Sequence, residues 1–266
     1  MLDFLNRIPM IILGLPAVLI SLSVHEASHA YAAYKLGDPT ARNLGRLTIN
    51  PMKHINPFGF ICMILFHIGW ANPVPINPRN FKDSKKGMAI SAAAGPLSNL
   101  CLAIISVVLL RLVLIPTQSI ADSYSTGLYS FFGSYGMSSD NTYWINPELR
   151  ENAIFVILSV IVAMLYLSIS LNLNLMFFNL IPLPPLDGSR IAYMFLPSDL
   201  YFKIMRYEVY IQMAFIFLLA MGMITLPLGF LTGGVTDFFY KLLGIPEDLL
   251  TVVTSDIFNR LPKFTF

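Results

Sequence analysis

Long apolar stretches separated by shorter polar segments make up most of this chain. Stretches from about Ile8 to Leu36, Gly87 to Ile115 and Ala153 to Ile181 each exceed the roughly 20 residues that a helix needs to cross a bilayer. The third is the clearest, because residues 152–186 contain no charged side chain. A fourth apolar stretch runs from about Val209 to Leu228. The pattern therefore predicts about four membrane-spanning helices.

The segments between and after these helices differ in character. The apolar run Phe58–Trp70 is too short to span, so we expect a re-entrant or interfacial segment, formed as a hairpin or as a pair of short strands. A polar loop is expected from Pro116 to Arg150, and a partly amphipathic interfacial tail from Gly229 to Phe266. The proline-punctuated stretch Asn72–Pro78 predicts extended backbone, which either pairs with a substrate strand or serves as a plain connector.

The composition supports a membrane setting. Hydrophobic residues make up 56% of the chain and charged residues 12%, with a mean hydropathy of +0.67. We expect an all-α polytopic protein with one integral membrane domain over residues 1–266, divided into a core (8–206) and a C-terminal helix and tail (207–266). The net charge of +2 does not point to nucleic acid, and no such partner is expected. Cys62 and Cys101 lie in apolar runs and predict free thiols.

Three ionisable side chains lie together in the first predicted helix, where they are costly unless they serve chemistry. His25 and His29 are four residues apart, so both project from one helical face and can hold one metal ion as neutral imidazoles. The expected metal is zinc, one ion per chain. Glu26 follows the first ligand directly, which suits a general base acting on water. The alternative is two structural histidines bonded to backbone carbonyls or water. His54 and His67 are expected to be structural or interfacial histidines.

A second focus lies at the end of the third predicted helix. Prolines at 182, 184 and 185 break this helix, and Asp187 follows as a lone carboxylate after a long apolar run. Irregular backbone at membrane depth is tolerated only where it is buried in protein or lines a wet cavity. Asp187 is thus the expected third metal ligand, and Gly188 would let the backbone come close. The alternative is an aspartate that caps a helix starting near Ser189.

The second predicted helix begins with small residues that favour close helix approach and contains Asn99. An asparagine in such a helix needs a partner. From its spacing alone, Asn99 supplies either a hydrogen bond to the proposed site or a structural bond between helices.

The distribution of basic residues predicts the orientation. The connector Lys35–Lys86 holds eight of the 17 Lys and Arg residues and Arg190–Arg206 holds three, whereas residues 116–151 hold only Arg150. By the positive-inside rule, both basic connectors face the cytoplasm and both termini face outward. His25 and Asp187 then both lie toward the cytoplasmic side of what we expect to be a bacterial or archaeal cytoplasmic membrane.

Three ordered motifs resemble those of the site-2 protease family of intramembrane zinc metalloproteases, in its compact form without a PDZ or CBS domain. They are His25-Glu26-Ala27-Ser28-His29, Gly95-Pro96-Leu97-Ser98-Asn99, and Asn179-Leu180-Ile181-Pro182 leading to Leu186-Asp187-Gly188. The resemblance implies that His25, His29 and Asp187 bind zinc and that Glu26 is the catalytic base. It also implies that Asn99 and Asn179 line the site and steady the substrate or the oxyanion.

The resemblance further implies that the enzyme hydrolyses a peptide bond within or near a transmembrane helix of a membrane protein, as in regulated intramembrane proteolysis. The expected partners are such a substrate and the lipid bilayer, with a homo-oligomer left open. Two alternatives remain at this point. An ion- or proton-coupled transporter would spread its charges along a pore and show paired repeats, and a catalytically inactive relative would lack part of the site.

Overall fold

The computed structural model describes residues 2–66, 71–123, 135–137, 143–145, 152–197, 200, 203–204, 206–245, 250 and 254. His67, most of the expected 116–150 loop and most of the expected tail beyond residue 245 lie outside this set. The described residues are helical apart from loops and one two-stranded hairpin.

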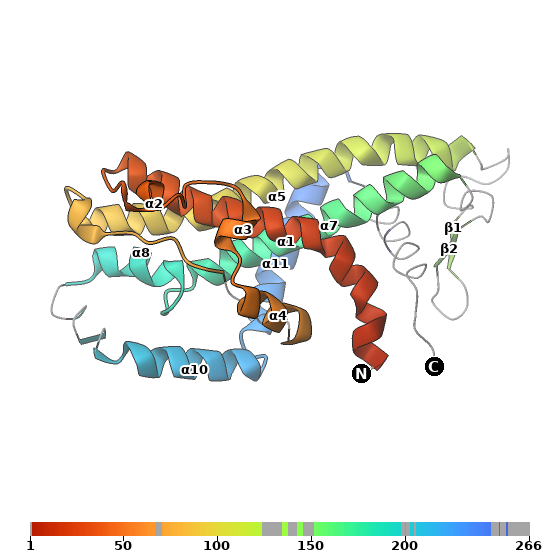
Figure 1. Cartoon of the computed structure of the whole chain (residues 1–266). Coiled ribbons are helices and arrows are strands. Elements are labelled where there is room, and N and C mark those ends of the chain that lie inside the picture. Colours follow the sequence, from red (N-terminus) through yellow and green to blue (C-terminus); the bar gives the residue numbers. More distant parts are fainter. Residues whose placement is uncertain are drawn as a thin grey trace. The chain divides into compact units, whose positions relative to one another are not determined.

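Three long helices confirm three of the four predicted spans (Figure 1): α1 (Leu2–Lys35), α5 (Ser84–Ser123) and α7 (Ala153–Leu180). Each contains a stretch long and apolar enough to cross a membrane, namely Ile11–Lys35, Ser84–Ile120 and Ala153–Leu180. The chain is thus an integral membrane protein. After α1 the chain turns at Gly37, whose φ of 109° is a conformation that glycine adopts at little steric cost.

The expected start of the polar loop at Pro116 is wrong, because α5 continues through this proline to Ser123. The proline removes one backbone donor, yet the helix runs on over residues 117–123, of which only Ile120 and Ala121 are apolar. The hydroxyl of the adjacent Thr117 donates to the Val113 carbonyl one turn earlier. Within the expected loop, β1 (Tyr135–Met137) and β2 (Tyr143–Ile145) form an antiparallel hairpin.

The fourth predicted span is also wrong as a single helix. Two helices, α10 (Glu208–Ala220) and α11 (Thr225–Leu243), replace it and the start of the expected tail. Gly222 separates them with a φ of 74°. Bonds from Met223 N to Leu218 O and from Gly222 N to Leu219 O close α10 in the pattern of a Schellman cap. At 13 residues, α10 is apolar but shorter than a span.

The connector between α1 and α5 contains short helices, α2 (Thr40–Asn43), α3 (Pro51–His54) and α4 (Pro57–Phe66), and a 3-10 turn, η1 (Pro78–Asn80). The alternative of two short strands over 58–70 is therefore wrong for residues 58–66. Asn56 Oδ1 accepts a bond from Gly59 N, and Pro57 occupies the first helical position, so the local sequence starts a helix. An antiparallel β-bridge pairs Ile55 with Ala71.

The chain forms two compact units, each built from separate stretches. One comprises Met1–Ala17, Ile104–Ile169 and Thr236–Phe266, and its core includes the fully buried Leu110 and Phe155. The other comprises Val18–Ala103 and Ser170–Val235 and contains every residue of the candidate site.

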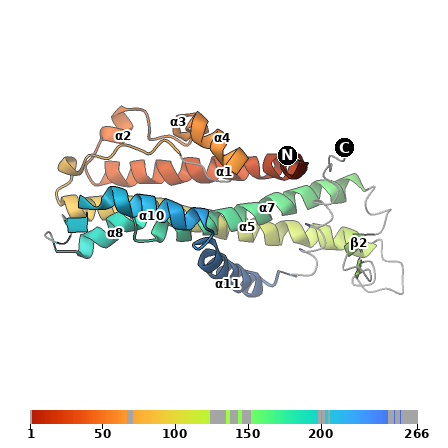
Figure 2. The ribbon, with the colours of Figure 1, turned by 90° about the horizontal axis from the view of Figure 1, so that it is seen from below.

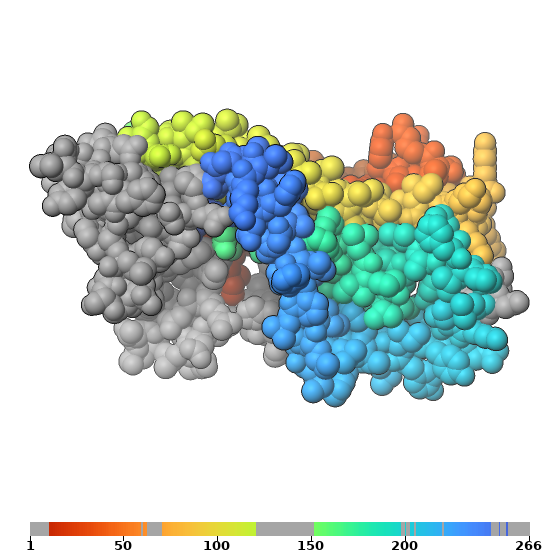
Figure 3. Space-filling model, turned by 180° about the vertical axis from the view of Figure 1, so that it is seen from behind, coloured from red at the N-terminus to blue at the C-terminus, as the bar shows by residue number. Residues whose placement is uncertain are grey.

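Within the second unit, α10 and the first part of α11 present large apolar side chains at the surface. Met213 and Phe217 are 63% exposed, Leu226 is 80% exposed and Phe230 is 83% exposed. Figure 3 shows both segments in blue on the visible surface. Such an apolar surface suits contact with lipid.

Candidate metal centre

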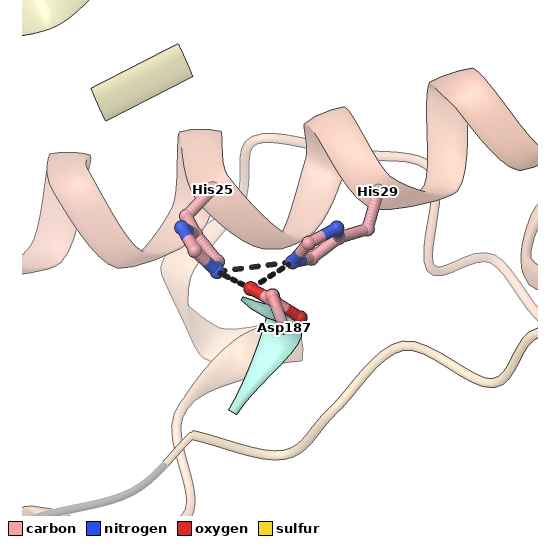
Figure 4. A group of neighbouring side chains, drawn as sticks. All are labelled: His25, His29 and Asp187. Atoms are coloured by element: carbon pink, nitrogen blue, oxygen red, sulfur yellow. Dashed lines mark hydrogen bonds and ion pairs between the residues drawn. The ribbon is translucent and has the colours of Figure 1, made fainter. Parts of the chain in front are cut away.

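Helix α1 places both predicted histidine ligands on one face, as their spacing of four residues requires. His25 and His29 are buried, with 6% and 7% of their surface exposed, and their Nε2 atoms lie 3.0 Å apart. Their ring planes are nearly perpendicular. The two Nε2 atoms therefore converge on one point beside the helix (Figure 4).

Asp187 completes this cluster from the start of α8 (Asp187–Phe195). Its Oδ2 atom lies 3.2 Å from the Nε2 atom of each histidine, as the dashed lines in Figure 4 show. Gly188 allows this approach, because a Cβ atom there would overlap the carbonyls of Leu180 and Ile181. The capping alternative is not supported, since the N-cap of α8 is Leu186 and no side chain caps the helix.

The hydrogen bonds on the far side of each imidazole prepare the cluster for a metal ion. His25 Nδ1 donates to Asn99 Oδ1 at 2.6 Å, and His29 Nδ1 donates to the Ser91 carbonyl at 2.7 Å. A neutral imidazole that carries its proton on Nδ1 has a free lone pair on Nε2. Such outer partners commonly orient histidine ligands of metals.

The Nε2 lone pairs therefore face a carboxylate oxygen. Asp187 Oδ2 is buried and accepts no hydrogen bond from any residue that the structure describes. Three electron-rich atoms within 4.8 Å of one another repel unless a cation lies between them. Two imidazole nitrogens and a carboxylate oxygen form a ligand set typical of zinc, so the residues fit this metal.

Gly95 brings α5 against the histidine pair. A Cβ atom at this position would lie 2.5 Å from His29 Cε1 and 2.6 Å from His25 Cε1. Any side chain here would displace the imidazoles. The small residue in the second motif therefore makes room for the ligands of the first.

Glu26 lies beside the cluster with 9% of its surface exposed. Its Oε2 atom accepts a hydrogen bond from Val74 N at 2.9 Å. Val74 belongs to the predicted extended stretch, which lies along α1 and packs with Ala30 and Ala41 in a small apolar core. In both ribbon views the connector helices α2, α3 and α4 lie alongside α1 (Figures 1 and 2).

Asp38, just past the end of α1, holds the far end of this stretch. Its buried carboxylate accepts bonds from Thr40, Asn77 N and Asn80 Nδ2. Burial acts to raise the pKa of Asp38, but the hydrogen bonds from Thr40, Asn80 and Asn77 outweigh it. The pKa of this carboxyl therefore lies below its ordinary value. The carboxylate ties residues 77–80 to the end of the helix that carries the histidines.

The two predicted site asparagines occupy different positions. Asn99 is fully buried against His25, and its Nδ2 donates to Asn172 Oδ1 at 2.8 Å. Asn179, near the end of α7, is partly buried and donates through Nδ2 to the Leu175 carbonyl. His54, expected to be structural or interfacial, is buried, and its Nε2 atom is hydrogen-bonded to the Thr48 carbonyl.

Sequence reasoning missed three groups at the site: the side chain of Asn172, the Val74 amide and the Ser91 carbonyl. Asn172 carried a signal, since it is a polar side chain in an uncharged apolar stretch. The two backbone groups carry none, because every residue of those types has the same peptide atoms.

A buried His-His-Asp cluster with an adjacent glutamate, set in long apolar helices, defines the class of membrane-embedded metal-dependent hydrolases. Residues 13–221 match the model of peptidase family M50, and the chain belongs to this family. It is thus a membrane zinc metalloprotease, with His25, His29 and Asp187 as the candidate metal site. The resemblance to site-2 proteases is confirmed, and the transporter alternative is not.

Two relatives agree with this assignment. YwhC of Bacillus subtilis (strain 168), a candidate zinc metalloprotease, is 37% identical over 257 residues, which cover 97% of this chain and 96% of YwhC. Rip2 of Mycolicibacterium smegmatis (strain ATCC 700084 / mc(2)155), also a candidate zinc metalloprotease, is 28% identical over 121 residues, which cover 44% of this chain and 46% of Rip2. No solved structure matches the chain.

Proposed function

We propose that this enzyme hydrolyses a peptide bond within or near a transmembrane helix of a membrane protein, in regulated intramembrane proteolysis. His25, His29 and Asp187 would hold one zinc ion, and Glu26 would be the catalytic base. The observation that carries the proposal is the convergence of three ligand atoms beside a buried glutamate on an apolar helix. A site at this position suits a substrate that is itself in the membrane.

When bound, zinc acts as a Lewis acid that polarises a carbonyl and lowers the pKa of a coordinated water to about 7. Glu26 accepts the proton of the attacking water and later donates it to the leaving amine. The Val74 N–H holds the Glu26 carboxylate beside the cluster while the other carboxylate oxygen remains for the proton. The low water content of a buried site strengthens each of these interactions.

Asn179 is the proposed donor to the oxyanion. Its amide nitrogen carries two hydrogens, of which one goes to Leu175 O. The second hydrogen can stabilise negative charge on the substrate oxygen, as side-chain amides do in other hydrolases. Replacement by Leu should then lower kcat, by about 10²- to 10³-fold for a full oxyanion donor, and leave zinc binding unchanged.

The stretch Asn72–Pro78 is a proposed docking edge for an unwound substrate. Three contacts support this role: its link to Glu26 at Val74, the bridge at the preceding Ala71 and the anchor at Asn77. Pro73 and Pro75 have no N–H, so an incoming strand would mainly donate to carbonyls at these positions. We further propose that the site faces the cytoplasmic side, with both termini outward.

The test measures zinc per chain and cleavage of a membrane-protein substrate in detergent or proteoliposomes. We expect about one zinc in the wild type, loss of zinc in His25→Ala and Asp187→Ala, and retention of zinc without cleavage in Glu26→Gln. Asp237→Ala, at an exposed aspartate of α11, is the matched control and should behave as wild type. Retention of zinc in Asp187→Ala, or cleavage by Glu26→Gln at the wild-type rate, would refute the assignment.

A further inference from the structure

We propose that Asn172 sets the orientation of the Asn99 amide and thereby the tautomer in which His25 presents Nε2 to zinc. Both asparagines are then positioning residues for the metal ligand. The inference rests on the proposed function in one respect, which is that His25 is a zinc ligand.

A chain of hydrogen bonds from α1 through α5 to α7 carries the inference. His25 Nδ1 and Asn99 Oδ1 are 2.6 Å apart, and Asn99 Nδ2 and Asn172 Oδ1 are 2.8 Å apart. The three side chains are buried, with 6%, 0% and 1% of their surface exposed. Water therefore cannot replace either bond, and each polar atom depends on its protein partner.

A primary amide is ambiguous, because a rotation of its plane by half a turn exchanges the acceptor oxygen and the donor nitrogen. With its nitrogen toward His25, Asn99 would require Nδ1 to accept, and the neutral ring would carry its proton on Nε2. That nitrogen could not bind a metal. The Asn172 oxygen pairs with the Asn99 nitrogen and leaves the Asn99 oxygen for His25. Reversal of Asn99 would therefore require the Asn172 amide to reverse and His25 to change tautomer at the same time.

His29 shows the contrast. Its Nδ1 faces the Ser91 carbonyl, which can only accept and is fixed in the backbone of α5. The tautomer of His29 thus needs no second side chain. His25 instead depends on a side-chain amide, and this difference explains why a second asparagine stands behind the first.

The same contacts separate Asn99 from the substrate. Its oxygen serves His25, one hydrogen of its nitrogen serves Asn172, and none of its surface is exposed. The role expected for Asn99 from the family resemblance, contact with the substrate or the oxyanion, is therefore replaced by a role toward the ligand. Of the two predicted asparagines, only Asn179 is left for the substrate.

The experiment measures the zinc dissociation constant of the full chain in detergent by competition with a chromophoric chelator, alongside thermal unfolding. Asn99→Leu should weaken zinc binding by about 10- to 100-fold, the usual effect of losing an outer partner of a ligand. Asn99→Asp should keep tight binding, because both carboxylate oxygens accept from His25 Nδ1. Asn174→Leu, on α7 like Asn172 but bonded to Thr232 and Ser170, is the matched control and should bind zinc as wild type.

The double variant distinguishes orientation from a plain interhelix bond. Asn172→Leu alone should weaken zinc binding, by about twofold if the Asn99 amide then populates both orientations equally. In the Asn99→Asp background, Asn172→Leu should have no further effect on zinc binding, since a carboxylate has no donor end to orient. A plain structural bond between α5 and α7 predicts instead that Asn172→Leu lowers the unfolding temperature and leaves zinc binding unchanged.

The outcomes separate this inference from the proposed function. Zinc binding by Asn99→Leu at wild-type affinity, while His25→Ala has lost zinc, would overturn the inference and leave the proposed function intact. Retention of zinc by His25→Ala would overturn both. Where Asn99→Leu does not fold, the comparison of Asn172→Leu with the double variant gives the decision.

Discussion

Substitution of Gly95 by alanine tests whether α5 shapes the metal centre. The added methyl would lie 2.5 Å from His29 Cε1 and 2.6 Å from His25 Cε1. Both rings are held at the opposite nitrogen, by the Ser91 carbonyl and by Asn99. The clash therefore falls on side chains that cannot move without losing a buried hydrogen bond.

The size of the effect follows from these distances. Ordinary contact with a Cβ atom begins at 3.4 Å, so the ring atoms must move by about 0.9 Å. Metal–ligand distances tolerate only about 0.2 Å, and a displacement of about 1 Å in an active site can cost on the order of 100-fold in rate. Overpacking of this kind also costs about 1–3 kcal/mol of stability. We expect Gly95→Ala to bind zinc poorly and to lose at least about 100-fold in kcat/KM.

The assay compares zinc content, thermal unfolding and substrate cleavage with those of Gly14→Ala. Gly14 lies in α1, the helix that carries the histidines, and a Cβ there would meet its nearest neighbour, Leu167, at an ordinary 3.8 Å. This control should keep wild-type zinc and activity and gain a little stability, because alanine favours helix over glycine. A Gly95→Ala enzyme with one zinc and wild-type cleavage would refute the argument.

Three further outcomes are expected. Gly188→Ala should lose zinc and about 1–3 kcal/mol of stability, because its Cβ would overlap the backbone carbonyls of Leu180 and Ile181; unchanged zinc content would contradict this. Asp38→Ala should lower the unfolding temperature, since each buried donor left unpaired costs about 1–3 kcal/mol. The pKa of Asp38 is lowered in the folded protein, so its contribution is complete above about pH 4 and is lost as the pH falls through the folded pKa. Asp38→Asn should flatten that part of the pH–stability profile, and an unaltered profile would count against the assignment. Each Gly→Ala replacement that strengthens the substrate helix near the cut should slow cleavage by about fivefold, because the scissile carbonyl must leave its helical bond; an unchanged rate would exclude local unwinding.

The sequence by itself determined the parts of this protein that depend on local spacing and length. Two histidines four residues apart must share a face of any α-helix, and apolar stretches longer than about 20 residues must find lipid or a protein interior. Three helices and the His25–His29 pair follow from these rules. Asp187 was predicted as the third metal ligand because an ionisable side chain at membrane depth usually serves a function.

Other local patterns were misleading for equally physical reasons. A proline usually ends a helix, yet α5 passes through Pro116 and continues over the mostly polar residues 117–123. Residues 209–228 look like one apolar span, yet a left-handed glycine at 222 ends α10. Hydropathy describes the transfer of side chains from water to an apolar phase. It carries no information on the backbone φ angle of a single residue such as Gly222.

Only the tertiary structure decided how residues distant in sequence meet at the site. Asn99 bonds His25 across 74 positions, and Val74 reaches Glu26 across 48. Such contacts depend on how closely two helices approach and on their relative rotation, which Gly95 and Gly188 permit but do not specify. The order of residue types along the chain indicates which side chains are buried. The direction of a buried amide or backbone N–H is set by the hydrogen-bond partners that packing places within about 3 Å.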